Sequence, residues 1–224
     1  IGTVFGQKSQ LWYHLPPGDS FELLGSIYNM TAAETRTRVE YLTEILELEP
    51  FLDQAVRKLS LGQRIRCEIA ASLLHNPEIL FLDEPTIGLD VTVKQKIREF
   101  IKKINEESGV TVFLTSHDTG DIEKICKRAI VINQGQLVWD GSVNNMKYSL
   151  LNKRIIDIRL DEPYSSHLED GVRLLKKKGR TAKLEVDLGQ TSMKKIMAHL
   201  VSENNVQDIS ISPVPMEEVI STIY

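Results

Sequence analysis

The stretch NPEILFLDEPTIGLD, residues 76–90, places four apolar residues directly before two adjacent carboxylates, Asp83 and Glu84. A short apolar run between turn-forming residues predicts a buried strand. Two acids at the end of such a strand are costly to hold together unless a cation or ordered water meets them there. By spacing alone, a strand that simply ends at the protein surface is the commoner explanation. The flanking sequence therefore has to decide between a surface end and a binding site.

Strand-like and helix-like segments alternate on both sides of this stretch. Strand patterns cover residues 1–5, 79–83 and 110–115, and helical spacing of apolar residues covers 31–46, 60–74 and 91–107. Strands separated by helices predict an α/β protein whose parallel sheet is covered by helices on both faces. The carboxyl ends of such strands form the edge where α/β proteins bind ligands. A Mg-nucleotide at that edge would explain the acid pair, because one carboxylate can hold the cation while the other orients water.

The pattern changes beyond about residue 150. Two segments alternate like half-exposed strands: RIIDIRL (154–160) and AKLEVDL (182–188). An amphipathic helix is predicted over SMKKIMAHLVSE (192–203), and a further strand over DISISPV (208–214). We therefore predict two domains, residues 1–150 and a small α+β domain at residues 151–224, with three strands and one helix in the second. RIIDIRL and DISISPV are predicted to pair in its sheet, and the apolar side chains of the helix, Ile196, Met197, Leu200 and Val201, are predicted to cover that sheet. The basic run RLLKKKGR, residues 173–180, is interpreted as a solvated helix end and turn.

Composition excludes several classes of protein. A net charge of −4 argues against nucleic-acid binding through bulk electrostatics, which needs a basic surface. The two cysteines, Cys67 and Cys126, lack metal-ligand spacing, and a reduced, intracellular setting fits them best. No apolar run approaches the roughly 20 residues of a membrane span. The sequence therefore predicts an ordinary globular protein with no nucleic-acid partner.

Two flanking motifs change the interpretation of the acid pair. LSLGQ, residues 59–63, lies upstream at the start of a predicted helix, and TSHD, residues 115–118, lies downstream at the end of the next strand. In this order and spacing, the segments LSLGQRIRCEIAASLLHNPEILFLDEPTIGLD and VFLTSHD resemble the nucleotide-binding subunit of an ATP-binding-cassette (ABC) transporter. The resemblance runs from Ile1 to about Gly141. FGQKSQLWYHLPPGDSFELLGSIYNM, residues 5–30, is further similar to a bacterial group of exporter ATPases that work with separate permeases.

The resemblance implies roles for the residues at the strand ends. Asp83 matches the Walker B aspartate, which helps to hold Mg²⁺. Glu84 matches the catalytic carboxylate that polarises water. His117 matches the switch histidine that contacts the γ-phosphate of ATP. The expected fold is thus part of a P-loop NTPase, a parallel sheet with a helical subdomain, followed by the small α+β domain.

The resemblance also implies residues that act across a dimer. Ser60, Gly62 and Gln63 match the signature motif, which contacts the ATP held by the opposite subunit. A hydroxyl at a helix N-terminus suits a phosphate, because unpaired amides and the positive end of the helix dipole lie beside it. Asp90 matches the loop that passes between the two subunits.

Two positions depart from the family pattern. Leu61 stands where glycine is usual, which leaves Ser60 and Gly62 intact. Gly6 stands where the family places its Q-loop glutamine, so Gln7 is predicted to link Mg²⁺ to the permease contact, with Gln10 as the alternative.

A larger departure is the missing phosphate-binding loop. No GxxxxGK[ST] motif occurs in the sequence, although the family uses its amides and lysine to hold the β- and γ-phosphates. The resemblance places that loop upstream of Ile1. We therefore expect a chain truncated before the Q-loop, and we expect this piece alone to be inactive.

The expected function is the ATP-binding and ATP-hydrolysing subunit of an export system. Its expected partners are a second nucleotide-binding subunit and an integral membrane permease, which would place it in the cytoplasm on the inner face of the cell membrane. Three alternatives remain: a non-transport ABC ATPase, a catalytically silent ABC-like binding module, and a regulatory role of the C-terminal domain alone. Trp12 and Tyr13 fit simple packing and permease docking equally well.

Overall fold

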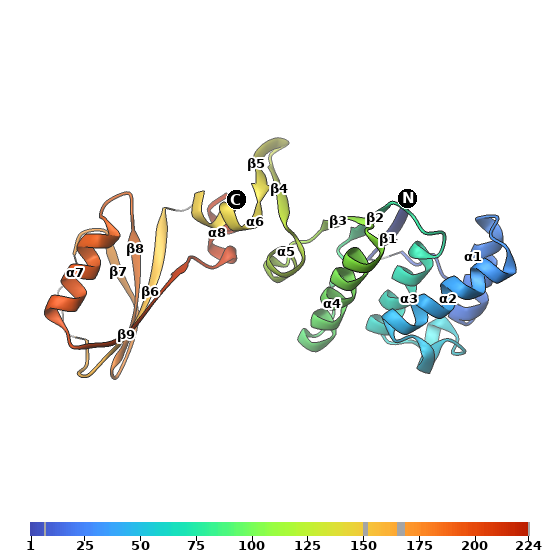
Figure 1. Cartoon of the computed structure of the whole chain (residues 1–224), viewed down its shortest axis with the longest axis horizontal. Coiled ribbons are helices and arrows are strands. Elements are labelled where there is room, and N and C mark those ends of the chain that lie inside the picture. Colours follow the sequence, from blue (N-terminus) through green and yellow to red (C-terminus); the bar gives the residue numbers. More distant parts are fainter. Residues whose placement is uncertain (7, 150–151, 165–168, 224) are drawn as a thin grey trace. The chain divides into compact units, whose positions relative to one another are not determined.

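The computed structural model describes residues 1–6, 8–149, 152–164 and 169–223, and Figure 1 shows the order of the elements along the chain. The chain divides into two compact units, Ile1–Cys126 and Lys127–Tyr224. Each unit has buried hydrophobic residues of its own. None of the helices in the described ranges combines the length and the apolar character needed to cross a membrane.

The first unit combines a parallel sheet with a group of helices. Its elements are β1 (Gly2–Phe5), α1 (Pro17–Ile27), α2 (Ala32–Leu46), the 3₁₀ turns η1 (Glu49–Phe51) and η2 (Val56–Lys58), α3 (Leu61–Leu73), β2 (Ile79–Asp83), α4 (Val91–Ser108), β3 (Thr111–Thr115) and α5 (Thr119–Ile125). The strands lie in the order β1-β2-β3, and both neighbouring pairs are parallel. This arrangement confirms the predicted α/β class.

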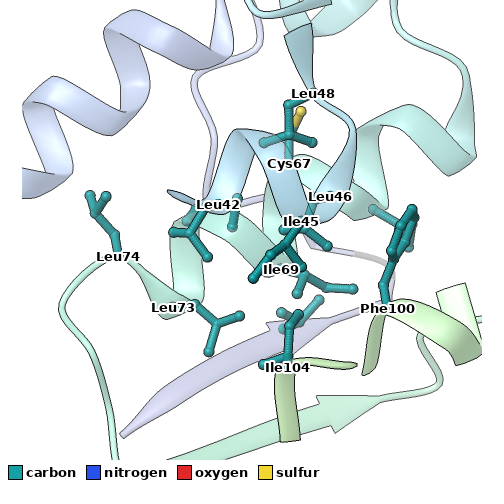
Figure 2. Close-up of a cluster of buried hydrophobic side chains, with 14 of the residues drawn as sticks. Leu42, Ile45, Leu46, Leu48, Cys67, Ile69, Leu73, Leu74, Phe100 and Ile104 are labelled. Carbon is teal, nitrogen blue, oxygen red and sulfur yellow. The ribbon is translucent and has the colours of Figure 1, made fainter. Parts of the chain in front are cut away.

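Five helices, α2, α3, α4, α5 and, in the second unit, α7 (Met193–Glu203), begin after N-cap residues whose side chains accept a backbone N–H. Thr31 and Glu34 form a capping box at the start of α2. At the C-terminal end of α4, Gly109 adopts a φ of 66°, a left-handed conformation that glycine reaches at little cost. The apolar faces of α2, α3 and α4 then meet in one core, shown in Figure 2, which includes Leu42, Ile45, Leu46, Ile69, Leu73, Phe100 and Ile104.

The two faces of the parallel sheet have different surroundings. Leu80 and Leu82 of β2 are buried on the face that packs into the core. On the opposite face Phe81 is 42% exposed and Phe113 is 50% exposed, and their rings stack with centroids 5.1 Å apart. The expectation of a sheet covered on both faces is therefore wrong for the structure described, because alternate residues of β2 and β3 remain exposed.

The second unit is built from antiparallel strands. Its elements are β4 (Arg128–Asn133), β5 (Gln136–Ser142), α6 (Val143–Ser149), β6 (Lys153–Leu160), β7 (Val172–Lys178), β8 (Thr181–Asp187), α7 (Met193–Glu203), β9 (Val206–Pro213) and α8 (Met216–Ile223). Strands β4 and β5 form a two-stranded hairpin, and the other four strands lie in the order β7-β8-β6-β9. Pairing of β6 with β9 agrees with the predicted pairing of RIIDIRL with DISISPV.

Three details of the second unit differ from the prediction. Residues 172–178 form an edge strand instead of a helix end, so the sheet has four strands. A second helix, α8, follows the last strand. On α7, Ile196 and Leu200 are buried as expected, whereas Val201 is 58% exposed and does not cover the sheet. The predicted domain division at residue 150 stays a prediction, while the compact unit itself begins at Lys127.

Candidate functional site

The acid pair lies where two parallel strands end side by side. Asp83 and Thr115 are partners in the register of β2 and β3. The hydroxyl of Thr115 donates to Oδ1 of Asp83 at 2.5 Å. The backbone N–H of Glu84 donates to the carbonyl oxygen of Thr115 at 3.1 Å and lies 3.2 Å from its hydroxyl oxygen. Thr115, which sequence reasoning did not select, therefore fixes the position of both acids.

The second acid meets the predicted switch histidine. Nδ1 of His117 lies 2.9 Å from Oε1 of Glu84. The His117 side chain is 72% exposed and that of Glu84 is 28% exposed, so the pair opens to solvent. Because Nδ1 is used by Glu84, Nε2 of the ring is left for another partner. The structure thus brings together Asp83, Glu84 and His117 from two different strand ends.

Glu84 has an unusual backbone conformation. Its φ is 50°, in the left-handed region that non-glycine residues seldom adopt. The N–H of Ile87 donates to the carbonyl oxygen of Glu84 at 3.2 Å and closes a tight turn after the strand. Backbone conformations of this kind cost on the order of 1–3 kcal/mol and concentrate at functional sites. The turn directs the Glu84 carboxylate toward the loop that carries His117.

An aspartate next to the histidine caps the following helix. Oδ1 of Asp118 accepts the backbone N–H of Gly120 at 2.9 Å at the start of α5. A hydrogen bond from Lys94, together with that cap and the positive charge of Arg98, lowers the pKa of Asp118 below its ordinary value. Asp118 therefore stays ionised and holds the loop after β3 against α4.

The predicted signature residues lie at the start of α3. Ser60 is the N-cap residue; its Oγ accepts the N–H of Gln63 at 3.3 Å, and its own N–H donates to Oε1 of Gln63 at 2.8 Å. A Cβ on Gly62 would lie 2.5 Å from Cγ1 of Val93, so only glycine lets α3 approach α4 this closely. The hydroxyl proton of Ser60 is not needed for the cap. It can donate to an anion in front of the helix.

Asp90 has a structural task at the start of the next helix. It is the N-cap residue of α4, and its Oδ1 accepts the N–H of Val93 at 3.0 Å. Since Val93 also contacts Gly62, the beginnings of α3 and α4 are neighbours. The predicted dimer loop and the predicted signature motif therefore lie close together in one chain.

The segment after β1 explains why glycine occupies position 6. The N–H of Gly6 donates to the carbonyl oxygen of Asp83 at 2.9 Å. A Cβ at this position would lie 2.9 Å from the carbonyl oxygens of both Asp83 and Glu84. Any larger residue would push the segment away from the acid strand, so a glutamine has to stand elsewhere in the loop.

Of the two candidate Q-loop glutamines, the structure describes only Gln10. Nε2 of Gln10 is 3.3 Å from the carbonyl oxygen of Thr3 and 3.1 Å from that of Glu68, so its amide group is engaged by the backbone. Gln7 lies outside the described residues. Its predicted role as the Q-loop glutamine stays a prediction.

A buried carboxylate that sequence reasoning missed holds this segment to α3. Glu68 is 4% exposed, accepts a hydrogen bond from the Ser9 hydroxyl and accepts the N–H of Gln10 at 3.1 Å. Burial raises the pKa of Glu68 above its ordinary value. One signal was available: an acid among apolar residues in CEIAASL needs a polar partner inside the protein.

The side chains at the strand ends do not by themselves make up a complete set of metal ligands in the part of the chain that the structure describes. Among the residues that the structure describes, no group of three or more histidine, cysteine, aspartate or glutamate side chains has the arrangement of a metal site. Cys67 is fully buried and Cys126 is half-buried. Asp83 remains the carboxylate best placed to hold a hard cation, because it is exposed at the strand end.

Comparison with known proteins gives consistent matches. Residues 1–87 match a family model described as ABC transporter. The ABC transporter ATP-binding protein NatA of Bacillus subtilis (strain 168) is 29% identical over 146 residues, covering 65% of this chain and 59% of that protein. The linearmycin resistance ATP-binding protein LnrL of the same organism is 26% identical over 221 residues, covering 97% of this chain and 70% of that protein.

A solved structure shares the arrangement of about two thirds of the chain. The ATP-binding cassette MJ0796, in a dimeric post-hydrolysis state with ADP and Pi, has a TM-score of 0.55 and 34% identity, covering 64% of this chain and 62% of that one. The chain therefore spans about 59% of the length of NatA and 62% of that structure. The match to LnrL covers nearly the whole chain, so it includes most of the second unit as well.

Proposed function

We propose that this chain is part of an ABC transporter ATP-binding subunit, and that the complete protein binds and hydrolyses ATP to drive export through a separate permease; the family match of residues 1–87 and the similarity to LnrL and MJ0796 support this. The edge where β2 and β3 end carries this proposal. Glu84 and His117 lie 2.9 Å apart there, and Asp83 is held beside them by Thr115. Such a group of side chains suits water activation next to a bound nucleotide.

Each residue at this edge has a distinct task in the proposed reaction. Asp83 fits a hard divalent cation, since its exposed carboxylate is already oriented by the Thr115 hydroxyl. When bound, Mg²⁺ would neutralise charge that develops on the phosphate oxygens. Glu84 would accept a proton from the attacking water. His117, oriented through Nδ1, would offer Nε2 to the γ-phosphate.

We propose a second nucleotide-binding subunit as the first partner. The starts of α3 and α4 lie side by side, with Ser60, Gly62 and Gln63 on one and Asp90 on the other. The positive end of the α3 dipole and the Ser60 hydroxyl proton, which the helix cap does not use, suit a phosphate held by an opposing subunit. The dimer described for MJ0796 supports this arrangement.

We propose a membrane permease as the second partner, which would place the protein on the cytoplasmic face of the membrane. Leu11 is buried, whereas Trp12 and Tyr13 beside it are 38% and 57% exposed. Neighbouring aromatic side chains of this kind are typical anchors of protein interfaces. The resistance function in the name of LnrL supports the export direction.

Residues 151–224 are proposed to serve as a positional domain without chemistry. Charged side chains in this part form ion pairs with one another, as Lys153 does with Glu185 at 3.1 Å and Lys183 does with Asp157 at 3.5 Å. The domain is held together by its own hydrophobic core, which includes Ile156, Leu184 and Leu200, and such a self-contained domain is suited to stabilise a dimer or to regulate it.

Glu84→Gln in the complete protein tests the proposed reaction. The substitution keeps the shape of the side chain but removes the base, so turnover should fall about 10²–10⁴-fold while ATP still binds. An ATP-bound dimer should then accumulate in size-exclusion chromatography. Glu78→Gln, at the opposite end of the same strand segment and exposed, is the matched control and should behave like the parent protein.

The outcome separates the proposal from its alternatives. Near-normal hydrolysis by Glu84→Gln would show that Glu84 is not the base. No ATP binding by the complete protein would favour the silent binding module. Hydrolysis that responds to ribosomes or DNA, and not to membranes containing the permease, would favour a non-transport ABC ATPase.

A further inference from the structure

Resting on the proposed hydrolytic function, we infer that Asp121 is a positioning residue that holds Glu84 and His117 in a single geometry. Asp121 lies in the first turn of α5 and is completely buried. A buried carboxylate is costly unless it is paired and hydrogen-bonded. Its partners come from three different elements, and two of these carry the catalytic side chains.

The first link runs to the loop after β2. The hydroxyl of Thr86 donates to Oδ2 of Asp121 at 2.6 Å, and Thr86 is only 1% exposed. Thr86 stands two residues after Glu84, within the tight turn that the Ile87 N–H closes on the Glu84 carbonyl. The link therefore fixes the turn that gives Glu84 its left-handed backbone.

The second link runs to the loop after β3. The hydroxyl of Ser116 donates to the same oxygen, Oδ2 of Asp121, at 2.7 Å. Oγ of Ser116 also accepts the N–H of Asp118 at 3.0 Å. His117 stands between these two residues, so its backbone is held on both sides. One carboxylate oxygen thus joins the loop of the base to the loop of the histidine.

The third link anchors this carboxylate to α4. Nε of Arg98 donates to Oδ1 of Asp121 at 2.7 Å, and Nη2 of Arg98 donates to Oδ1 of Asp118 at 3.1 Å. The Arg98 side chain is 8% exposed, so the charges pair away from water. Since Asp90 is the N-cap residue of α4, the same helix connects the predicted dimer loop to the catalytic pair.

The chemistry of these links requires a carboxylate. Asp121 accepts two hydroxyl protons on one oxygen and a guanidinium proton on the other, and it donates nothing. Asparagine has the same shape but replaces one acceptor with an N–H₂ donor, which would face another donor. Asp121→Asn should therefore release at least one of the three elements while the volume of the side chain stays the same.

The test measures steady-state ATP hydrolysis by the complete protein and its Asp121→Asn variant. We expect kcat to fall about 10- to 100-fold with KM for ATP changed less than about threefold, because the catalytic pair is displaced while nucleotide binding persists. Glu185→Gln is the matched control: Glu185 is also a buried carboxylate, paired with Lys153 in the second unit. The control should lose thermal stability and keep kcat.

Two further measurements separate positioning from a loss of folded structure. In the Glu84→Gln background, Asp121→Asn should still form the ATP-bound dimer at the same ATP concentration, because the network acts on the geometry of hydrolysis. Thr86→Val and Ser116→Ala each cut one link, and each should lower kcat by itself. Combining either with Asp121→Asn should add little to the loss, since all three act through one carboxylate.

The results distinguish this inference from the proposed function. An active parent protein whose Asp121→Asn variant keeps its kcat, or loses kcat only in proportion to folded protein, would overturn the positioning role alone. If Asp121→Asn does not fold, unchanged kcat in both Thr86→Val and Ser116→Ala would overturn it. A complete protein that does not hydrolyse ATP would remove the proposed function, and this inference with it.

Discussion

The two compact units place their buried charges in different ways. In Ile1–Cys126, Asp121 and Arg98 pair beneath loops that leave parallel strands at one edge. In Lys127–Tyr224, Glu185 pairs with Lys153 within an antiparallel sheet. Parallel strands bring their following loops to a common edge, whereas antiparallel strands send successive loops to opposite ends. The same type of ion pair can therefore organise a site in the first unit and only stabilise the fold in the second.

The largest effect is expected from a substitution that creates a cavity in the core of the second unit. Leu184 of β8 is fully buried, so Leu184→Ala should lower the free energy of unfolding of this unit by about 2–5 kcal/mol. Chemical denaturation measures the loss, and KM for ATP in the complete protein should stay unchanged. Leu175→Ala, at a position 42% exposed in the neighbouring strand, is the control and should cost far less. A large change in KM would contradict the separation of tasks.

Deletion of residues 151–224 from the complete protein should have an intermediate effect. ATP affinity, measured by equilibrium titration, should change less than about twofold, while dimerisation should weaken about tenfold, or roughly 1.4 kcal/mol. The reason is that the catalytic pair and its supporting network all lie within Ile1–Cys126. Loss of nucleotide binding in a variant that still folds would place part of the site in the second unit.

The smallest predicted effect concerns the pH dependence of stability. Burial raises the pKa of Glu68 in the folded protein above the ordinary 4.5. The contribution of this group to the free energy of unfolding is therefore fully present below pH 4.5, where the carboxyl is protonated in both states, and it is lost as the pH rises through the folded-state pKa. Glu68→Gln cannot ionise and should avoid that loss. The difference in unfolding free energy between variant and parent should thus shift in favour of the variant as pH rises above 4.5. A difference that is constant with pH would contradict the raised pKa.

Local patterns predicted most of the first unit and the outline of its site. The apolar run before Asp83 predicted β2 correctly, and Ser60 with Gln63 forms the capping box that begins α3. These signals succeed because they depend on residues a few positions apart. Asp121 and Thr115 escaped prediction, since their importance comes from partners about 30 residues away along the chain.

The second unit shows where local reasoning fails. Strand β7 carries Leu174 and Leu175 in succession, and a register shift between Leu174 and Lys176 breaks the alternation expected of a strand. Its run of lysines looked like a solvated turn, but charged residues are common on edge strands, where they discourage pairing with other chains. Helix α8 carried no cap signal that was recognised, so it was missed.

The stacked pair Phe81 and Phe113 has a consequence for how this chain behaves at the bench. Together with Phe5, which is 54% exposed, the pair gives one sheet face a set of accessible aromatic rings. Such a surface attracts environment-sensitive dyes and neighbouring molecules alike. Sulfate and other strongly hydrated salts strengthen apolar association, so turbidity should set in at lower protein concentration as ammonium sulfate is added. The protein concentration at which the 224-residue chain begins to aggregate would then be set by these three aromatic rings and not by its net charge.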